Sequence, residues 1–223
     1  MTDHPYNLEM TKFLALNISV SEDGFMAGPN QSLDSPLGEN GMLLHEWAFS
    51  TKRFRERFGE SGGSTGIDND FIERGFTNIG ATIMGRNMFG PIRGVWPDDK
   101  WQGWWGPNPV FEHPVFILTH HSRESIDMGN GTIFNFVTGG IEQAYELALL
   151  AARDKDVRVG GGAQTIQQFM ELGLLDEIHV AQVPVNLNSG EALFTNRNLQ
   201  LKDYRPVEPV RSPSVQHQTY IKI

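Results

Sequence analysis

The chain has 223 residues, 39% apolar and 20% charged, which is enough apolar content for a buried core and argues against wholesale disorder. The 18 Lys and Arg against 27 Asp and Glu give a formal charge of −9, so nucleic acid is excluded as a partner, because binding a phosphate backbone needs a basic surface. The sequence has no cysteine, no signal-peptide pattern and no membrane-length apolar segment, which excludes disulfides, thiolate metal sites and a membrane partner and predicts a soluble, cytoplasmic protein.

The predicted elements alternate between apolar, strand-like runs and segments with helical spacing of apolar residues. In chain order they are a strand over 13–20, helices over 43–58 and 68–76, strands over 81–84, 114–119 and 132–137, a helix over 141–152, a strand over 157–159, a helix over 166–174, and strands over 178–185 and 218–223. Pro184 indicates a sheet edge or a bulge near the end of its strand.

This alternation with short crossovers predicts an α/β fold with a mostly parallel sheet, to which the C-terminal strands add an antiparallel edge. No linker separates two self-sufficient cores, so we expect residues 1–223 to form a single domain.

A run of three glycines gives the strongest functional signal. Gly160, Gly161 and Gly162 follow a strand and open a helix. A backbone without side chains can approach a ligand closely, and the N–H groups of the first helical turn face an anion there. The run lacks the Lys-Ser/Thr of a Walker loop and the spacing of the dinucleotide fingerprint. We expect a phosphate site; the alternative is a tight turn that needs positive φ.

Two further motifs follow strands. Met84–Met88 contains Gly85 and Arg86, where a dinucleotide could lie against the backbone and pair with the guanidinium; an ordinary surface arginine is the alternative. Thr119–Arg123 contains two adjacent histidines, which favour a pocket for an adenosine phosphate over a metal site, since neighbouring residues at a strand end point to opposite sides.

Taken in order, four segments resemble the dihydrofolate reductase superfamily, and most closely the branch related to the reductase domain of the bifunctional deaminase-reductase of riboflavin biosynthesis. These segments are DGFMAG (23–28), IMGRNMF (83–89), VFILTHHS (115–122) and VGGGAQTIQQFMELGLLDEIHV (159–180). The resemblance covers about Phe13 to Phe194.

The resemblance implies a three-layer α/β/α fold, a homodimer, and NADPH as the hydride donor to a C=N or C=O group of a small heterocycle. Arg86 with His120 or His121 would favour NADPH over NADH. The implied cofactor-binding residues are Ser19, Gly28, Gly85, Arg86, Asn87, Leu118, Thr119, His120, His121, Gly160, Gly161, Gly162, Ala163, Gln164 and Thr165.

The resemblance also implies a catalytic carboxylate on a helix upstream of the Met-Gly-Arg motif. Counting back without gaps leads to Asn69, so the candidates are its neighbours Asp68 and Asp70. The alternative is that both aspartates only cap the helix. Asp34, on an early loop, is a further candidate for substrate binding.

Four of the five tryptophans lie between Pro91 and Pro109. Trp96, together with Trp101, Trp104 and Trp105, could stack on a planar heterocycle; a packed loop or a subunit contact is the alternative.

Three functions follow from these patterns. The first is a reductase acting on a ribosylaminopyrimidine of riboflavin biosynthesis, or on a pterin such as dihydrofolate. The second is a non-catalytic NADP(H)-binding module, and the third is a flavin- or ligand-binding structural protein.

Overall fold

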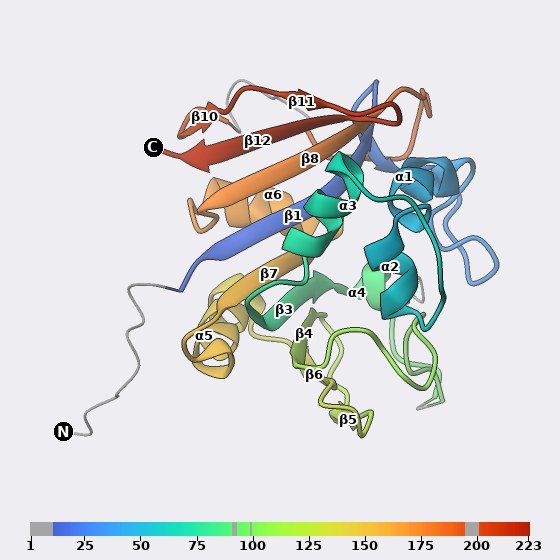
Figure 1. Ribbon diagram of the computed structural model, residues 1–223. Helices are drawn as coiled ribbons and strands as arrows, with labels where there is room; N and C mark the ends of the chain where they lie inside the picture. The colour runs from blue at the N-terminus through green and yellow to red at the C-terminus, as the bar shows by residue number, and fades with distance from the viewer. Residues whose placement is uncertain (1–10, 91–92, 99, 195–200) are drawn as a thin grey trace.

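The computed structural model describes residues 11–90, 93–98, 100–194 and 201–223. The remainder of the expected 1–223 domain, including part of the Pro91–Pro109 loop, lies outside the described residues. Within the described ranges, ten strands form one sheet in the order β10-β12-β8-β1-β7-β3-β4-β6-β5, with β11 paired to β12 (Figure 1). No helix in these ranges is both long enough and apolar enough to cross a membrane.

The strands of this sheet are β1 (Phe13–Ser21), β3 (Ile79–Gly85), β4 (Pro114–Leu118), β5 (Ile126–Asp127), β6 (Ile133–Val137), β7 (Asp156–Gly161), β8 (Glu177–Val183), β10 (Tyr204–Pro206), β11 (Val210–Arg211) and β12 (Gln216–Lys222). Two short strands, β2 (Phe25–Ala27) and β9 (Glu191–Ala192), pair separately. The helices are η2 (Gly41–His45), α1 (Glu46–Phe49), α2 (Lys52–Arg57), α3 (Ile67–Arg74), α4 (Arg86–Phe89), α5 (Gly140–Ala152) and α6 (Ala163–Glu171).

The sheet is parallel from β8 through β6 and antiparallel where β12 joins β8. Helices α5 and α6 cover one face, and α1, α2 and α3 cover the other (Figure 1). The predicted α/β/α fold with a mostly parallel sheet and an antiparallel C-terminal edge is therefore confirmed.

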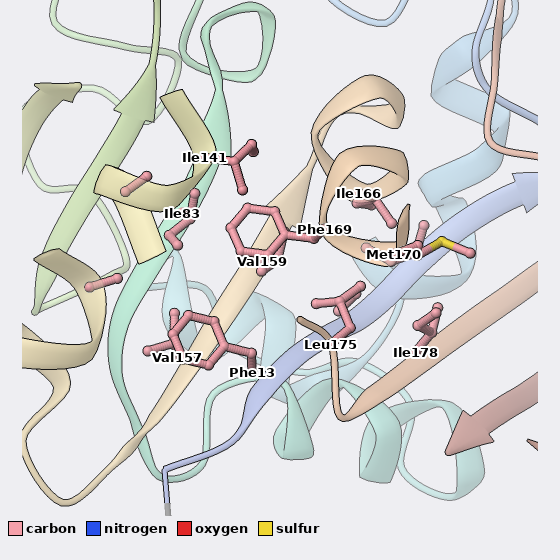
Figure 2. Packing of buried hydrophobic residues seen from close by; sticks show 14 of the residues in the cluster. Phe13, Ile83, Ile141, Val157, Val159, Ile166, Phe169, Met170, Leu175 and Ile178 are labelled. Atoms are coloured by element: carbon pink, nitrogen blue, oxygen red, sulfur yellow. The ribbon is translucent and has the colours of Figure 1, made fainter. Parts of the chain in front are cut away.

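The larger core lies between the sheet and the helices α5 and α6 (Figure 2). Alternate residues of the strands, such as Val157 and Val159 in β7, point into it because side chains of a strand alternate between faces. The ring of Phe13 stacks on Tyr145 at 4.1 Å between centroids, and Phe169 and Ile166 present the apolar stripe of α6 to the strands. This core fixes α6, and therefore its amino terminus, against the sheet.

The single helix predicted over 43–58 is wrong. The segment forms three short pieces, and the chain turns extended at Thr51, which has φ −77° and ψ 149°. The Thr51 hydroxyl accepts the N–H of Phe54 and donates to the carbonyl of Ala48, and the Lys52 N–H donates to the Ser64 carbonyl. A threonine cap therefore ends one helix and begins the next.

The interpretation of Pro184 also needs correction. Strand β8 is internal, lying between β1 and β12, and it ends at Val183. Since the ladder stops before the proline, the missing N–H removes no strand hydrogen bond. The register shift in the β1–β8 pair lies between Ala15 and Ile18, at the opposite end.

Candidate functional site

The three glycine- and histidine-containing motifs meet at one edge of the sheet. The strands β3, β4 and β7 are parallel neighbours, so their carboxyl ends lie together. Met84 pairs with Gly161, and Gly85 pairs with Leu118. In open α/β sheets, ligands bind outside the carboxyl ends of the strands. The sequence motifs are therefore assembled where this fold class places its ligands.

Gly85 is in direct contact with the glycine run. A Cβ atom at Gly85 would lie 2.6 Å from Oγ1 of Thr165 and 3.4 Å from the backbone nitrogen of Gly162. No side chain fits in this space, since carbon and oxygen atoms do not approach so closely without displacement. Gly85 is therefore required for the close approach of β3 to the start of α6.

The glycine run leaves the amino end of α6 open. Gly161 has φ +131°, a conformation that favours glycine. Gly162 is the N-cap, and a Cβ there would have no neighbour within 4 Å among the described residues. The first turn of α6 contains no acidic residue. Its N–H groups and the helix dipole are thus available to an anionic ligand.

An arginine cluster lies beside this edge. The guanidinium of Arg86 lies 3.7 Å from the ring centroid of Trp96, and that of Arg123 lies 5.1 Å from the same ring. Burial lowers the pKa of Arg86, and the charges of Arg93 and Arg123 lower it further. Nε and Nη2 of Arg86 are buried without a hydrogen-bond partner among the described residues. Arg86, which directly follows Gly85, therefore supplies positive charge and two donors that have no partner among the described residues.

Trp96 joins the arginine cluster to the histidine motif. Its Nε1 donates to the carbonyl oxygen of His121 at 3.0 Å. The backbone N–H of His121 donates to Oγ1 of Thr119 at 3.2 Å, and His120 is exposed. The guanidinium of Arg86 lies over the face of the Trp96 ring, so the ring holds this guanidinium in place at the site.

The other tryptophans of the loop pack inward. Trp105 makes an edge contact with Phe111 at 4.8 Å between centroids, and Nε1 of Trp101 donates to the carbonyl oxygen of Phe89 at 3.0 Å. Both indoles pack on the apolar cluster around Phe89 and Phe134. Trp101 and Trp105 thus match the packed-loop alternative.

Ser19 and Gly28 lie on β1 and on the loop after β2. The Ser19 hydroxyl is 3% exposed and accepts the Nε1–H of Trp47 at 2.9 Å, so a cofactor contact from this position would use main-chain atoms. A Cβ at Gly28 would lie 1.9 Å from the carbonyl oxygen of Glu39. Gly28 is therefore required by the packing of its own loop. Asp34 is exposed on the same loop.

The three residues considered for the catalytic carboxylate have different surroundings. The side-chain oxygen of Asn69 accepts the backbone N–H of Arg53 at 2.8 Å. Asp70 is exposed. Asp68 lies at the start of α3, its side chain is 14% exposed, and its Oδ1 lies 2.8 Å from Nε2 of His217. Of the two aspartates, Asp68 is the one held in a defined, half-buried position.

Asp68 ends a chain of hydrogen bonds that crosses three strands. The N–H of Asn17 donates to Nδ1 of His179 at 3.1 Å, and Nε2 of His179 lies 3.0 Å from Nδ1 of His217. Because Nδ1 of His179 accepts, its neutral ring carries the proton on Nε2 and donates it to His217. His217 then donates from Nε2 to Asp68. The order of the contacts therefore determines both tautomers.

The surroundings keep both imidazoles uncharged. Burial lowers the pKa of His179 to about 3, helped by His217 and Arg74. Burial lowers the pKa of His217 as well, although Asp68 opposes this. Phe71 stacks on both rings, at 4.3 Å from His179 and 4.0 Å from His217. We infer neutral donors along the whole chain at neutral pH.

This chain of hydrogen bonds could not be predicted from the sequence. His179 and His217 sit in strands with ordinary alternation, 38 positions apart, and only strand pairing brings them together. The alternation of each histidine with apolar neighbours predicts that both side chains point to one face of the sheet. It does not predict that α3 covers that face. The contact of Trp47 with Ser19 could not be predicted either, because the sequence predicts a continuous helix over 43–58.

Solved structures of low sequence identity share this fold. A putative riboflavin biosynthesis protein from Shewanella sp. PV-4 has 18% identity and a TM-score of 0.58, covering 96% of this chain and 99% of that one. A pyrimidine reductase-like protein from Corynebacterium diphtheriae has 16% identity and a TM-score of 0.54, covering 96% and 92%.

A third structure is the diaminohydroxyphosphoribosylaminopyrimidine deaminase/5-amino-6-(5-phosphoribosylamino)uracil reductase of Thermotoga maritima. It has 13% identity and a TM-score of 0.54, and the match covers 96% of this chain and 58% of that one. None of the curated proteins matches. The family model named RibD C-terminal domain matches residues 12–212. The chain therefore belongs to the RibD C-terminal domain family.

Proposed function

We propose that this protein is an NADPH-dependent reductase that transfers hydride to a C=N or C=O group of a small heterocycle. The observation that carries the proposal is the contact between Gly85 and the glycine run at the open amino end of α6. A backbone cradle of this kind suits the pyrophosphate of a dinucleotide.

The residues at the sheet edge fit NADPH in their chemistry. The N–H groups that begin α6 would hold the pyrophosphate, and Arg86 has buried donors without a partner among the described residues. Arg86 and Arg123 would hold the 2′-phosphate, which supports a preference for NADPH over NADH. Leu118, Thr119, His120 and His121 would flank the adenosine. In this proposal the role of Trp96 is to orient Arg86, rather than to bind the substrate.

The cofactor, when bound, supplies the hydride; the protein positions the reactants and delivers a proton. We propose Asp68 as the acid. His217 donates to one of its oxygens, which leaves the second oxygen for a substrate or an ordered water. Asp70 would remain a solvent-exposed residue of the first helical turn.

We propose a pyrimidine of the riboflavin pathway as the substrate class, a ribosylaminopyrimidine as in 5-amino-6-(5-phosphoribosylamino)uracil reductases. Membership in the family and the structural similarity to the Thermotoga deaminase/reductase support this choice. A pterin such as dihydrofolate is the second candidate. That residues 1–223 form one domain, and that the chain is a homodimer, stay predictions.

A non-catalytic NADP(H)-binding module is the competing function. It would use the same glycine cradle but would give Asp68 only a structural role, as a helix-terminal partner of His217. NADPH oxidation that depends on Asp68 would remove this alternative.

The proposal is tested by titrating the protein with NADPH and with NADH while its melting temperature is measured. A ligand that binds only the folded state stabilises it by about 2.7 kcal/mol at a hundredfold excess over Kd. We expect a clear rise with NADPH and a smaller one with NADH. If neither cofactor raises the melting temperature, the glycine run is only a turn and the proposal is wrong.

A further inference from the structure

A cavity lies at the amino ends of β3 and β7, at the opposite end of these strands from the glycine run. It has a volume of about 170 Å³ and is bounded by β3, β7, the end of α3 and the segment before β4. Asn78 and Ile79, at the amino end of β3, and Lys155, just before β7, contribute to its wall. Because the strands are parallel, this end is remote from the carboxyl ends where the cofactor is proposed to bind.

The cavity concentrates positive charge in an acidic protein. Arg57, Lys155 and Arg158 line it, and Glu112 is its only carboxylate among the described residues. Glu112 is already paired, since its Oε2 accepts from Nη1 of Arg57 at 2.8 Å. The charges of Lys155 and Arg158 therefore have no carboxylate of their own in the described cavity wall.

In the cavity wall, the positive charge of Arg158 would be stabilised most by a bound anion. Arg158 projects from the middle of β7 under the end of α3, and burial lowers its pKa to about 10. Its Nη1 donates to the carbonyl oxygen of Gly75 at 3.4 Å, and its Nε is buried with no hydrogen-bond partner among the described residues. A guanidinium has five N–H donors, and a buried charge is unfavourable unless it is paired.

The remaining wall holds the cations in place. The guanidinium groups of Arg57 and Arg158 lie 4.9 and 5.7 Å from the ring centroid of Phe76. Nε2 of His113 lies 2.7 Å from Oγ1 of Thr82. Burial and the charges of Arg158, Arg57 and Lys155 lower the pKa of His113 to about 4. The positive charges that add to the effect of burial on this imidazole would attract an anion.

We propose that this cavity binds a small oxyanion, a phosphate or carboxylate group, between Arg158 and Arg57 with Lys155 at its mouth. Sites for whole drug-sized ligands measure about 300–1,000 Å³, so the cavity suits a single charged group. A neighbouring cavity of about 360 Å³ shares Arg57 and Glu112 with it. The anion is thus either free in solution or the charged end of a larger molecule that extends into the neighbouring cavity.

The test uses the full-length protein and inorganic phosphate at constant ionic strength, with chloride as the replaced anion. We expect phosphate to raise the melting temperature with saturation and to give a measurable heat of binding. Arg158→Met, which keeps an unbranched apolar stem, should abolish both signals. Lys155→Gln alters an exposed residue, so it leaves folding intact and should weaken phosphate binding several-fold. Lys202→Gln, which changes another exposed lysine, is the matched control and should bind phosphate normally.

Equal stabilisation by chloride, or phosphate binding unchanged in both Arg158→Met and Lys155→Gln, would overturn the proposal. NADPH binding by Lys155→Gln should equal that of the wild type, so failure of this site is distinguishable from failure of the cofactor site. Ribose 5-phosphate forms a second arm. Tighter binding than phosphate supports the site as the end of a larger ligand, and equal binding supports it as a site for a free anion.

Discussion

Nε2 of His217 lies 2.8 Å from Oδ1 of Asp68, although the two residues are 149 positions apart in the chain. The contact joins the first turn of α3 to the C-terminal strand β12. His217 is itself held by His179, whose Nδ1 accepts a backbone N–H. A single arrangement of hydrogen bonds therefore fixes the position of the carboxyl group that we propose as the acid.

Replacing His217 tests this positioning. His217→Leu should lower turnover roughly tenfold to a hundredfold, because general acid catalysis depends on the placement of the donor and contributes about 10²–10⁴ in rate. NADPH affinity should be unchanged. His217→Gln, which can present an N–H near the position of Nε2, should restore part of the rate. Steady-state turnover across pH measures both, and an unshifted pH profile in His217→Leu would contradict the role of His217.

Asp68 and Asp70 form a matched pair for testing the acid. Asp68→Asn keeps an oxygen that can accept from His217 but removes the acid, so turnover should fall by about a hundredfold or more. Asp70→Asn alters an exposed side chain in the same helical turn and should leave turnover within about twofold, since surface substitutions usually have small effects. Comparable losses in both variants would show that the position of Asp68 is not special.

Two glycines of the proposed cofactor site should respond differently to alanine. At Gly162 a Cβ meets no described atom within 4 Å, so Gly162→Ala should keep its melting temperature but lose NADPH affinity, because the methyl group enters the space before α6. At Gly85 the Cβ clashes with Thr165, so Gly85→Ala should lose about 1–3 kcal/mol of stability. Calorimetry with and without NADPH separates the two effects, and Gly85→Ala combined with Thr165→Ala should regain stability.

Arg86 and Arg123 should determine the choice of cofactor. Arg86→Gln and Arg123→Gln should each weaken NADPH binding by roughly tenfold to a hundredfold, since charge-assisted hydrogen bonds contribute about 1.5–3 kcal/mol, and should barely change NADH binding. Dissociation constants for both cofactors provide the measurement. A parallel loss for NADPH and NADH would place these arginines at a group that the two cofactors share.

Stability should fall as the solution becomes acidic. Burial lowers the pKa of His45 to about 4, of His113 to about 4 and of His179 to about 3. The unfolded chain takes up protons on these residues below about pH 6.5, while the folded chain does not, so the free energy of unfolding decreases from about pH 6.5 towards pH 4. Each residue should contribute roughly 1–2 kcal/mol of this loss between about pH 7 and pH 5.

Urea unfolding at several pH values measures this slope. His113→Gln should flatten it, because the variant has one fewer imidazole to protonate in the unfolded chain. A free energy of unfolding that stays constant between about pH 7 and pH 5 would contradict the inference that these histidines stay neutral in the folded chain.

Much of the fold could be predicted from local patterns. Apolar runs located the strands of the parallel sheet, and the periodicity of Ile141, Ala144, Ala148 and Ala152 located α5, whose buried residues are these four. The prediction over 43–58 failed because Thr51 is compatible with a helix in sequence terms, whereas its hydroxyl forms a cap that depends on Ala48 and Phe54. The cap formed by the Thr51 side chain therefore interrupts the helix, although the apolar residues of this segment recur at helical spacing.

The site divides in a similar way. Gly85 and Gly160–Gly162 could be recognised because their chemistry depends on local backbone shape and on the strand ends that precede them. The arginine cluster and the histidine chain could not, because each depends on partners from distant segments, such as Arg86 with Trp96 and Asp68 with His217. The charged cavity around Arg158 could not be predicted either, because the sequence does not show which segments cover an arginine in a strand.

The position of β1 has a consequence for biosynthesis. Phe13 pairs with Val157, and Ala15 pairs with Ile178, so both neighbours of β1 are synthesised only after helix α5. Until β7 and β8 have left the ribosome, β1 has exposed edges and neither of its partners. The centre of the sheet therefore closes only after β8 has been made, and a nascent chain stalled before β7 is expected to be a substrate for chaperones that bind exposed strands.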